Sequence, residues 1–166
     1  MADDVVGILK SAYAEEIETV ANYLALSIAL DGVKAEEIKE KLSADVPEEL
    51  GHARVIAQRL KELGAVPPGS LGLEFKQNML QVPRETTDVR SVVRGVLDAE
   101  ETAISTYRGL IEAARAVNDP VTEDLAITIL ADEEKHRALF RGYLLELEGT
   151  GERARGQETA TPSRSR

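Results

Sequence analysis

The chain carries one pattern of glutamate, tyrosine and histidine twice, and the two copies are 84 residues apart. Each copy has a lone glutamate, a tyrosine seven residues later, and a Glu-x-x-His motif that begins 33 residues after the lone glutamate. The matched pairs are Glu16 and Glu100, Tyr23 and Tyr107, Glu49 and Glu133, and His52 and His136. The chain has only 2 histidines, and both of them belong to the repeat.

Capping residues, glycines and prolines predict four long helical segments. The segments run from about residue 3 to 31, 33 to 63, 88 to 118 and 120 to 149. Asp3 or Asp4 caps the first segment. Thr87 or Asp88 caps the third. Pro47 lies inside the second segment and is expected to kink or interrupt that helix.

The connections predict how the helices are arranged. Short turns at Asp31-Gly32 and Asn118-Asp119-Pro120 make each pair of helices antiparallel. The connection from 64 to 87 is long and rich in proline and glycine, which is unusual in a compact domain unless it travels along the bundle. The prediction is therefore an all-α four-helix bundle with one long crossover between helices 2 and 3.

The lone glutamates both lie in the middle of an apolar helical stripe. The stripe around Glu16 comprises Val5, Leu9, Ala12, Val20, Tyr23, Ser27 and Leu30, and that around Glu100 comprises Val89, Val93, Val96, Ile104, Tyr107, Ile111 and Ala114. A buried carboxylate is costly unless it is paired or binds a metal. A Glu and a His three residues apart point the same way on a helix. The predicted metal site comprises Glu16, Glu49, His52, Glu100, Glu133 and His136.

The donor atoms of this site limit the metals that fit it. Four carboxylates carry a charge that balances two divalent cations, and oxygen with imidazole suits iron or manganese and tolerates zinc. The chain has no cysteine, so iron–sulfur clusters, thiolate zinc sites and disulfides are excluded. Without metal, some of these carboxylates are expected to take up protons, which metal binding would release.

Composition and charge narrow the class of protein. The chain has 2 Phe, 4 Tyr and no Trp, which favours a helical core of aliphatic residues over a β-sandwich. A net charge of −10 argues against nucleic-acid binding and suits a protein that attracts cations. The sequence shows neither a signal peptide nor a membrane span, so a cytoplasmic protein is expected.

Other residues near the motifs have two possible roles. Tyr23 and Tyr107 either fill core space or form hydrogen bonds with the ligand carboxylates. Four further acidic residues sit beside the proposed ligands but point elsewhere on their helices, so they are expected to be solvated or interfacial. They are Glu15, Glu48, Glu101 and Glu134.

At these motifs the chain resembles bacterioferritin and its smaller relatives, the bacterioferritin-like (Dps-like) mini-ferritins of the ferritin-like superfamily. The matching stretches are Glu16–Tyr23, Glu48–Ala53 and Ile129–His136, and the resemblance covers about residues 3–149. It implies a ferroxidase and iron-storage protein that holds two irons per subunit and oxidises Fe(II) to Fe(III) with O2 or H2O2. It also implies that Glu16 and His52 are terminal ligands of one iron, Glu100 and His136 of the other, and that Glu49 and Glu133 bridge them.

Two departures from the family patterns bear on the function, and two alternatives to a ferroxidase remain. Leu50 stands where bacterioferritins have a haem-binding Met, so no haem is expected. Ala103 stands where rubrerythrin-type peroxidases have a further carboxylate, which argues against a peroxidase of that type. The alternatives are a di-metal redox enzyme of rubrerythrin, peroxidase or manganese-catalase type without mineral storage, and a packing or DNA-protecting protein whose metal site is vestigial.

The last residues, 150–166, are predicted to form a flexible polar basic tail after a bundle domain of residues 1–149. This tail is interpreted as an inert end, a DNA-touching arm or an address for loading into a larger compartment. Ferritins with 24 subunits usually add a fifth helix at this point. Its absence favours a homo-oligomeric shell of twelve subunits, with all ligands supplied by one chain.

Overall fold

A computed structural model of the protein describes residues 2–158, and the side chains of 4–149. The described residues form α-helices and short 3-10 turns without any strand. The α-helices are α1 (Ala2–Ala29), α2 (Glu36–Glu62), α3 (Val89–Ala116) and α4 (Pro120–Glu158), and the turns are η1 (Val33–Ala35) and η2 (Ser70–Gly72). The predicted all-α fold is confirmed.

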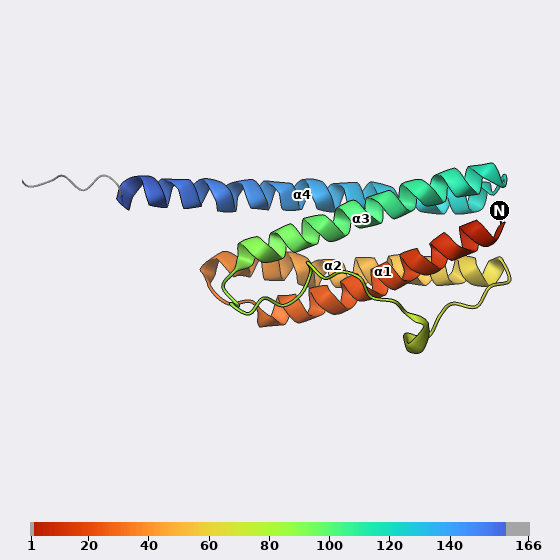
Figure 1. The fold of residues 1–166 in the computed structure, drawn as a ribbon, viewed down its shortest axis with the longest axis horizontal. Helices are drawn as coiled ribbons and strands as arrows, with labels where there is room; N and C mark the ends of the chain where they lie inside the picture. The colour runs from red at the N-terminus through yellow and green to blue at the C-terminus, as the bar shows by residue number, and fades with distance from the viewer. Residues whose placement is uncertain (1, 159–166) are drawn as a thin grey trace, which may run out of the picture.

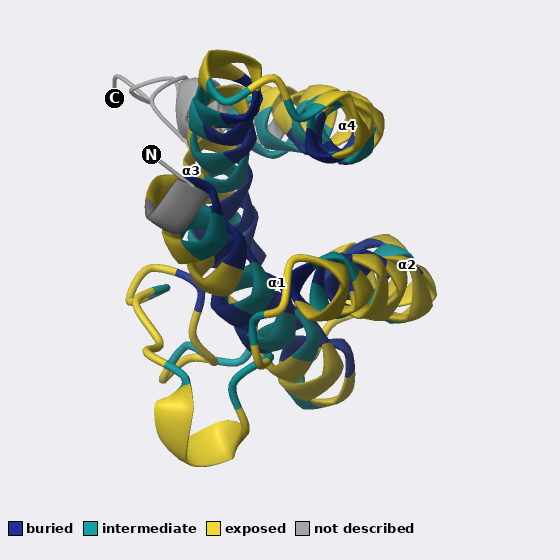
Figure 2. Cartoon of the chain, turned by 90° about the vertical axis from the view of Figure 1, so that its right-hand side faces the viewer, coloured by how far each residue is buried: buried dark blue, intermediate teal, exposed yellow. Residues whose placement is uncertain are grey.

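The helices form two antiparallel hairpins that lie one above the other (Figure 1). Helix α1 packs against α2, α3 packs against α4, and the hairpins meet mainly where α1 contacts α3 (Figure 2). The chain from 63 to 88 returns along the bundle from the end of α2 to the start of α3. The fold is therefore the four-helix bundle with one long crossover that the sequence predicts.

The two short turns use left-handed backbone conformations. Gly32, between the helices of the first hairpin, has φ 97°, and Asn118, between those of the second, has φ 56°. Glycine adopts this region without steric cost, and asparagine tolerates it better than most residues. Asp88 then caps α3, because its carboxylate accepts a hydrogen bond of 3.1 Å from the backbone N–H of Ser91.

Helix α2 does not break at Pro47, so of the two predicted effects, a kink or an interruption, the interruption is wrong. The helix is continuous from Glu36 to Glu62 with Pro47 inside it. Proline removes one backbone hydrogen bond, but it leaves the bonds on either side intact. Ile38 and Leu42 before the proline, and Ile56 after it, are buried. Packing on both sides therefore holds the helix together across the missing bond.

Helix α4 runs to Glu158, so its predicted end near Gly149 is also wrong. Its C-terminal part extends beyond the ends of the other helices (Figure 1). Glycine inside a helix costs only about 1 kcal/mol relative to alanine, so Gly149 need not stop the helix. Residues 159–166 of the predicted tail lie outside the described residues.

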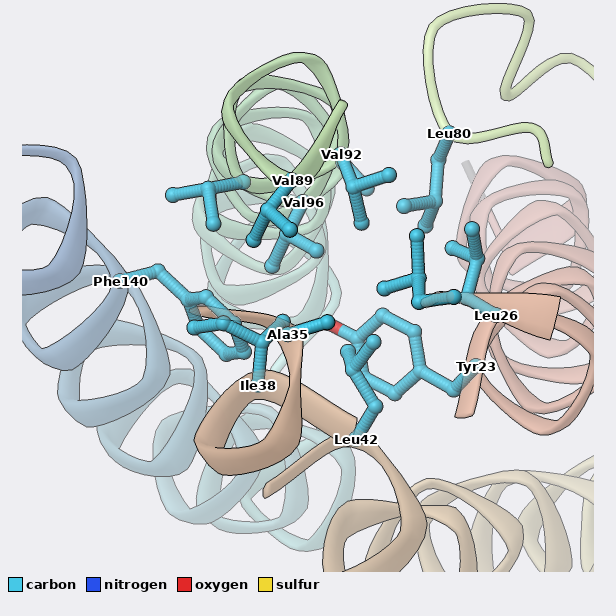
Figure 3. Close-up of a cluster of buried hydrophobic side chains, with 13 residues drawn as sticks. Tyr23, Leu26, Ala35, Ile38, Leu42, Leu80, Val89, Val92, Val96 and Phe140 are labelled. Carbon is cyan, nitrogen blue, oxygen red and sulfur yellow. The ribbon is translucent and has the colours of Figure 1, made fainter. Parts of the chain in front are cut away.

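The core consists of two apolar clusters at different heights in the bundle. One contains Tyr23 and Leu26 of α1, Leu42 of α2, Val96 of α3 and Phe140 of α4 (Figure 3). The other is built around Leu9, Ile56, Tyr107, Leu110 and Ile129. On every helix, the residues of one cluster lie on one side of the repeated Glu or Glu-x-x-His motif, and those of the other cluster lie beyond it. The motifs therefore occupy a polar layer between two apolar ones.

The crossover is fixed to α1 and α3. The buried carboxylate of Glu18 accepts hydrogen bonds from the backbone N–H groups of Lys76 (2.7 Å) and Gln77 (2.8 Å). Leu80 is buried in the core. A Cβ added at Gly95 of α3 would lie 2.3 Å from the carbonyl oxygen of Met79. Only glycine therefore lets the crossover lie this close to α3.

Replacing this glycine should loosen the crossover. Gly95→Ala is expected to destabilise the protein by about 1–3 kcal/mol, because the new methyl group overlaps the Met79 carbonyl. Gly109→Ala, in the same helix but with nothing within 4 Å of the added carbon, should stabilise it by about 0.5–1 kcal/mol. Chemical denaturation checks this difference, and equal effects of the two changes would contradict the proposed contact.

Candidate metal centre

The structure brings the six predicted residues together at mid-height in the bundle. Helix α1 supplies one carboxylate, α3 supplies another, and α2 and α4 each supply a Glu and a His. All six side chains are buried. Their exposed fractions are 3% for Glu16, 1% for Glu49, 7% for His52, 2% for Glu100, 3% for Glu133 and 5% for His136.

The six residues form two groups, in each of which the candidate ligand atoms lie within 4.8 Å of one another. One group is Glu16, Glu49, His52 and Glu133, and the other is Glu49, Glu100, Glu133 and His136. Glu49 and Glu133 belong to both groups. The arrangement is therefore suited to two neighbouring cations that share two carboxylates.

Each imidazole directs its Nδ1 atom toward carboxylates from both halves of the repeat. His52 Nδ1 lies 3.2 Å from Glu133 Oε1 and 3.4 Å from Glu49 Oε2. The other oxygen of Glu49, Oε1, lies 3.3 Å from His136 Nδ1. The two oxygens of Glu49 thus face different histidines.

The lone glutamates make longer contacts within their own half of the repeat and hydrogen bonds with the tyrosine of the other half. Glu16 Oε2 lies 3.7 Å from His52 Nδ1, and Glu100 Oε1 lies 3.8 Å from His136 Nδ1. The Tyr23 hydroxyl donates a hydrogen bond of 2.7 Å to Glu100 Oε1, and the Tyr107 hydroxyl donates one to Glu16 Oε1. Each tyrosine also packs in an apolar cluster, so it both fills core space and holds a carboxylate of the opposite hairpin.

Several polar atoms of this cluster have no hydrogen-bond partner. Among the described residues, 8 buried side-chain atoms are unpaired in this sense, and five belong to the six residues. They are Glu49 Oε1, His52 Nδ1, Glu100 Oε2, Glu133 Oε1 and His136 Nδ1. Some of these atoms lie close to one another, but the angles between the groups do not fit a hydrogen bond. An unsatisfied buried polar group costs about 1–3 kcal/mol, so five at one point fit a place where cations bind. Oxygen and imidazole donors are a fitting set for iron, manganese or zinc.

The outer nitrogens of the histidines face acidic residues that the sequence interpretation did not assign to the site. His52 Nε2 lies 3.6 Å from Asp132, and His136 Nε2 lies 3.4 Å from Glu48 and 4.0 Å from buried Asp45. These carboxylates favour a proton on Nε2, which leaves Nδ1 free to bind a cation. Glu48 and Asp132 are 84 residues apart, so the repeat itself contained the missed signal.

The other neighbours differ in their surroundings. Exposed Glu101 pairs with Arg137 and Arg141, each at 3.1 Å. Exposed Glu134 pairs with Arg108 at 2.8 Å. The exposure of Glu101 and Glu134 agrees with the expectation that they are solvated or interfacial. Glu15 is half-buried, and its Oε2 atom is among the unpaired buried atoms of the described residues.

The pKa values differ among these residues. Burial raises the pKa of Glu16 to about 8 and that of Glu133 to about 7, and it raises the pKa of Glu100 well above its usual range. For Glu49, burial also favours the neutral form, but the imidazoles of His136 and His52 outweigh it and lower the pKa to about 2. Burial acts to lower the pKa of His136, but the carboxylates of Glu49 and Glu100 raise it to about 9. At neutral pH, bound protons therefore neutralise part of the negative charge of this cluster.

The family model of the ferritin-like domain matches residues 6–150. The chain belongs to the ferritin-like family. It is 30% identical over 159 residues to the DNA protection during starvation protein of Pyrococcus furiosus, covering 93% of this chain and 84% of that protein. It is 24% identical over 174 residues to the bacterioferritin of Desulfovibrio desulfuricans, covering 96% of this chain and 93% of that protein.

Solved structures of ferritin-like proteins have the same fold. A dodecameric thioferritin of Bacteroides fragilis, a bacterioferritin-related protein, matches with a TM-score of 0.76 and 25% identity, covering 98% of this chain and 93% of that one. The bacterioferritin of Desulfovibrio desulfuricans, solved with its diiron site, matches with a TM-score of 0.77 and 22% identity, covering 99% and 95%. The predicted resemblance is thus confirmed. In the described part of this ferritin-like chain, no helix is long and apolar enough to span a membrane.

The tyrosine contacts can be tested by metal titration. Tyr23→Phe should weaken Co2+ binding about 10-fold to 100-fold, because Glu100 loses the hydroxyl that orients its carboxylate. Tyr13→Phe, outside the centre, should leave the affinity unchanged. An affinity equal to that of the unmodified protein in Tyr23→Phe would show that Tyr23 only fills space.

The pKa values predict the direction of a pH effect on metal binding. At pH 7, Glu16, with a pKa of about 8, and His136, with a pKa of about 9, are mostly protonated and must lose these protons to bind a cation. Affinity for Zn2+ should therefore rise by about tenfold or more per pH unit between pH 6 and 7.5. Calorimetry in buffers with different ionisation enthalpies should detect released protons, and fewer of them in Glu16→Gln. An affinity that does not change with pH would contradict these values.

Proposed function

We propose that this chain is a ferroxidase that oxidises Fe(II) to Fe(III) at a di-iron carboxylate site within each subunit and stores or detoxifies the product. The observation that carries this proposal is the convergence of five unpaired buried donor atoms on two groups of side chains that share Glu49 and Glu133. Membership of the ferritin-like family and the resemblance to bacterioferritin support iron as the metal. Manganese or zinc would be substitutes for it, and no haem is expected.

The residues have separate roles in this proposal. Glu16 and His52 hold one ferrous ion, and Glu100 and His136 hold the other. Glu49 and Glu133 bridge the two ions, a role supported by their place in both groups. Tyr23 and Tyr107 orient the terminal carboxylates, and the acidic residues beside the outer histidine nitrogens fix the imidazoles.

Iron is the substrate of the reaction. Two ferrous ions lose one electron each, and one O2 takes both electrons with two protons to give H2O2. Alternatively, one H2O2 takes two electrons and two protons to give two water molecules. The carboxylates neutralise the cations, and protons leave the centre as the cations bind. The apolar layers above and below limit the access of water to the site.

The ferric product would pass into a homo-oligomeric shell, for which we propose twelve subunits. The dodecameric thioferritin of Bacteroides fragilis, which has the same fold at 25% identity, supports this number over twenty-four. The Pyrococcus furiosus relative is named for DNA protection. With a net charge of −10 on this chain, we expect no electrostatic binding of DNA.

Aerobic addition of Fe(II) tests the function. The protein should develop ferric absorbance rapidly, and Glu49→Gln should slow the initial rate at least about 100-fold, because one bridging carboxylate loses its charge. Glu134→Gln is the matched control, because Glu134 is an exposed neighbour of the centre that pairs with Arg108. Equal rates in the two variants would contradict a role for the centre.

Light scattering coupled to size-exclusion chromatography after loading tests storage. A twelve-subunit shell that retains iron is expected. Oxidation by a monomer or dimer that retains no iron would contradict storage and favour a di-metal redox enzyme of the peroxidase or manganese-catalase type.

A further inference from the structure

Glu15 lies where two hollows of the protein meet. A groove of about 660 Å³ runs between α1 and α3, and its acidic lining residues are Asp4, Glu15, Asp98 and Glu101. A much smaller hollow of about 10 Å³ is lined by Glu15 together with Glu16, Glu100 and Glu133. Glu15 is thus the acidic residue common to the outer groove and the wall of the metal centre.

The small hollow is also bordered by unpaired acceptor atoms. Glu100 Oε2 and Glu133 Oε1 have no hydrogen-bond partner among the described residues, and these side chains are only 2% and 3% exposed. Buried carboxylate oxygens without donors favour the arrival of a cation. Glu15 Oε2 is a further buried atom of the described residues that lacks a partner.

We propose that Glu15 is a positioning residue on the entry path of the divalent cation, which it takes from the groove and passes to the centre. This inference rests on the proposed function for the identity of the cation as ferrous iron. A hollow of about 10 Å³ has room for roughly one water-sized sphere, so the ion must shed most of its hydration shell there. A carboxylate at that point replaces lost water oxygens, and the acidic groove raises the local concentration of cations.

The two halves of the repeat differ along this path. The positions equivalent to Glu15 and Thr19 in the second half of the chain are Ala99 and Ala103, and all four residues line the small hollow. Helix α1 therefore supplies the polar groups, and α3 supplies methyl groups that leave space. The departure from the repeat occurs at the surface of the centre that faces the groove. None of these four residues belongs to either group of candidate ligands, so the departure suits an entry path.

Stopped-flow binding of Co2+ to the full-length, metal-free protein tests the path, because cobalt absorbance reports entry without any oxidation. Glu15→Gln should slow binding about 10-fold, while the equilibrium dissociation constant should stay within about twofold. Ala103→Leu, which narrows the same hollow, should also slow entry. Glu112→Gln makes the same change of charge at an exposed position of α3 outside both hollows, and it should bind cobalt at the rate of the unmodified protein.

Three results would overturn the proposal. Binding at the original rate in Glu15→Gln would show that cations enter elsewhere. Equal slowing in Glu15→Gln and Glu112→Gln would show an effect of net charge alone. A loss of equilibrium affinity that matches the loss of rate would make Glu15 a ligand rather than a residue of the path. If slowing specific to Glu15→Gln occurs in a protein that does not oxidise Fe(II), the path stands and the ferroxidase proposal fails.

Discussion

Four buried carboxylates at mid-height in the bundle are the constraint on which the rest of the structure depends. Glu16, Glu49, Glu100 and Glu133 are each at most 3% exposed, and like charges so close together cannot all remain ionised without partners. Protons, imidazoles and tyrosine hydroxyls compensate part of this charge. Bound cations would compensate the rest. The apolar clusters on either side provide the burial free energy that allows such a polar layer to exist.

The contacts around the centre join the two hairpins. The Tyr23 hydroxyl holds Glu100, Tyr107 holds Glu16, and His52 approaches Glu133. Neither hairpin could therefore form the centre alone. The crossover helps to set their relative position through its bonds to Glu18 and its close contact with α3, and so structure far from the chemistry determines the geometry of the site.

Much of this arrangement could be predicted from the repeat. A Glu on an apolar stripe and a Glu-x-x-His motif on the next helix place their side chains on one face, because helical periodicity is local. The break expected at Pro47 and the end expected near Gly149 failed because single residues set only weak preferences, which packing or a continuing helix can override. Glu48 was expected to be solvated or interfacial; it is exposed and still reaches His136, since a long side chain at the rim of a site can do both.

The sequence by itself determined the fold class, the crossover and the six residues that meet, because each follows from spacing along the chain. Only the tertiary structure decided that Glu49 directs its two oxygens to different histidines and that each tyrosine holds the carboxylate of the opposite half. It also decided that Glu15 joins the outer groove to the centre. These relations depend on how two hairpins are placed in space, and no local pattern in the chain encodes distances between helices that are far apart in sequence.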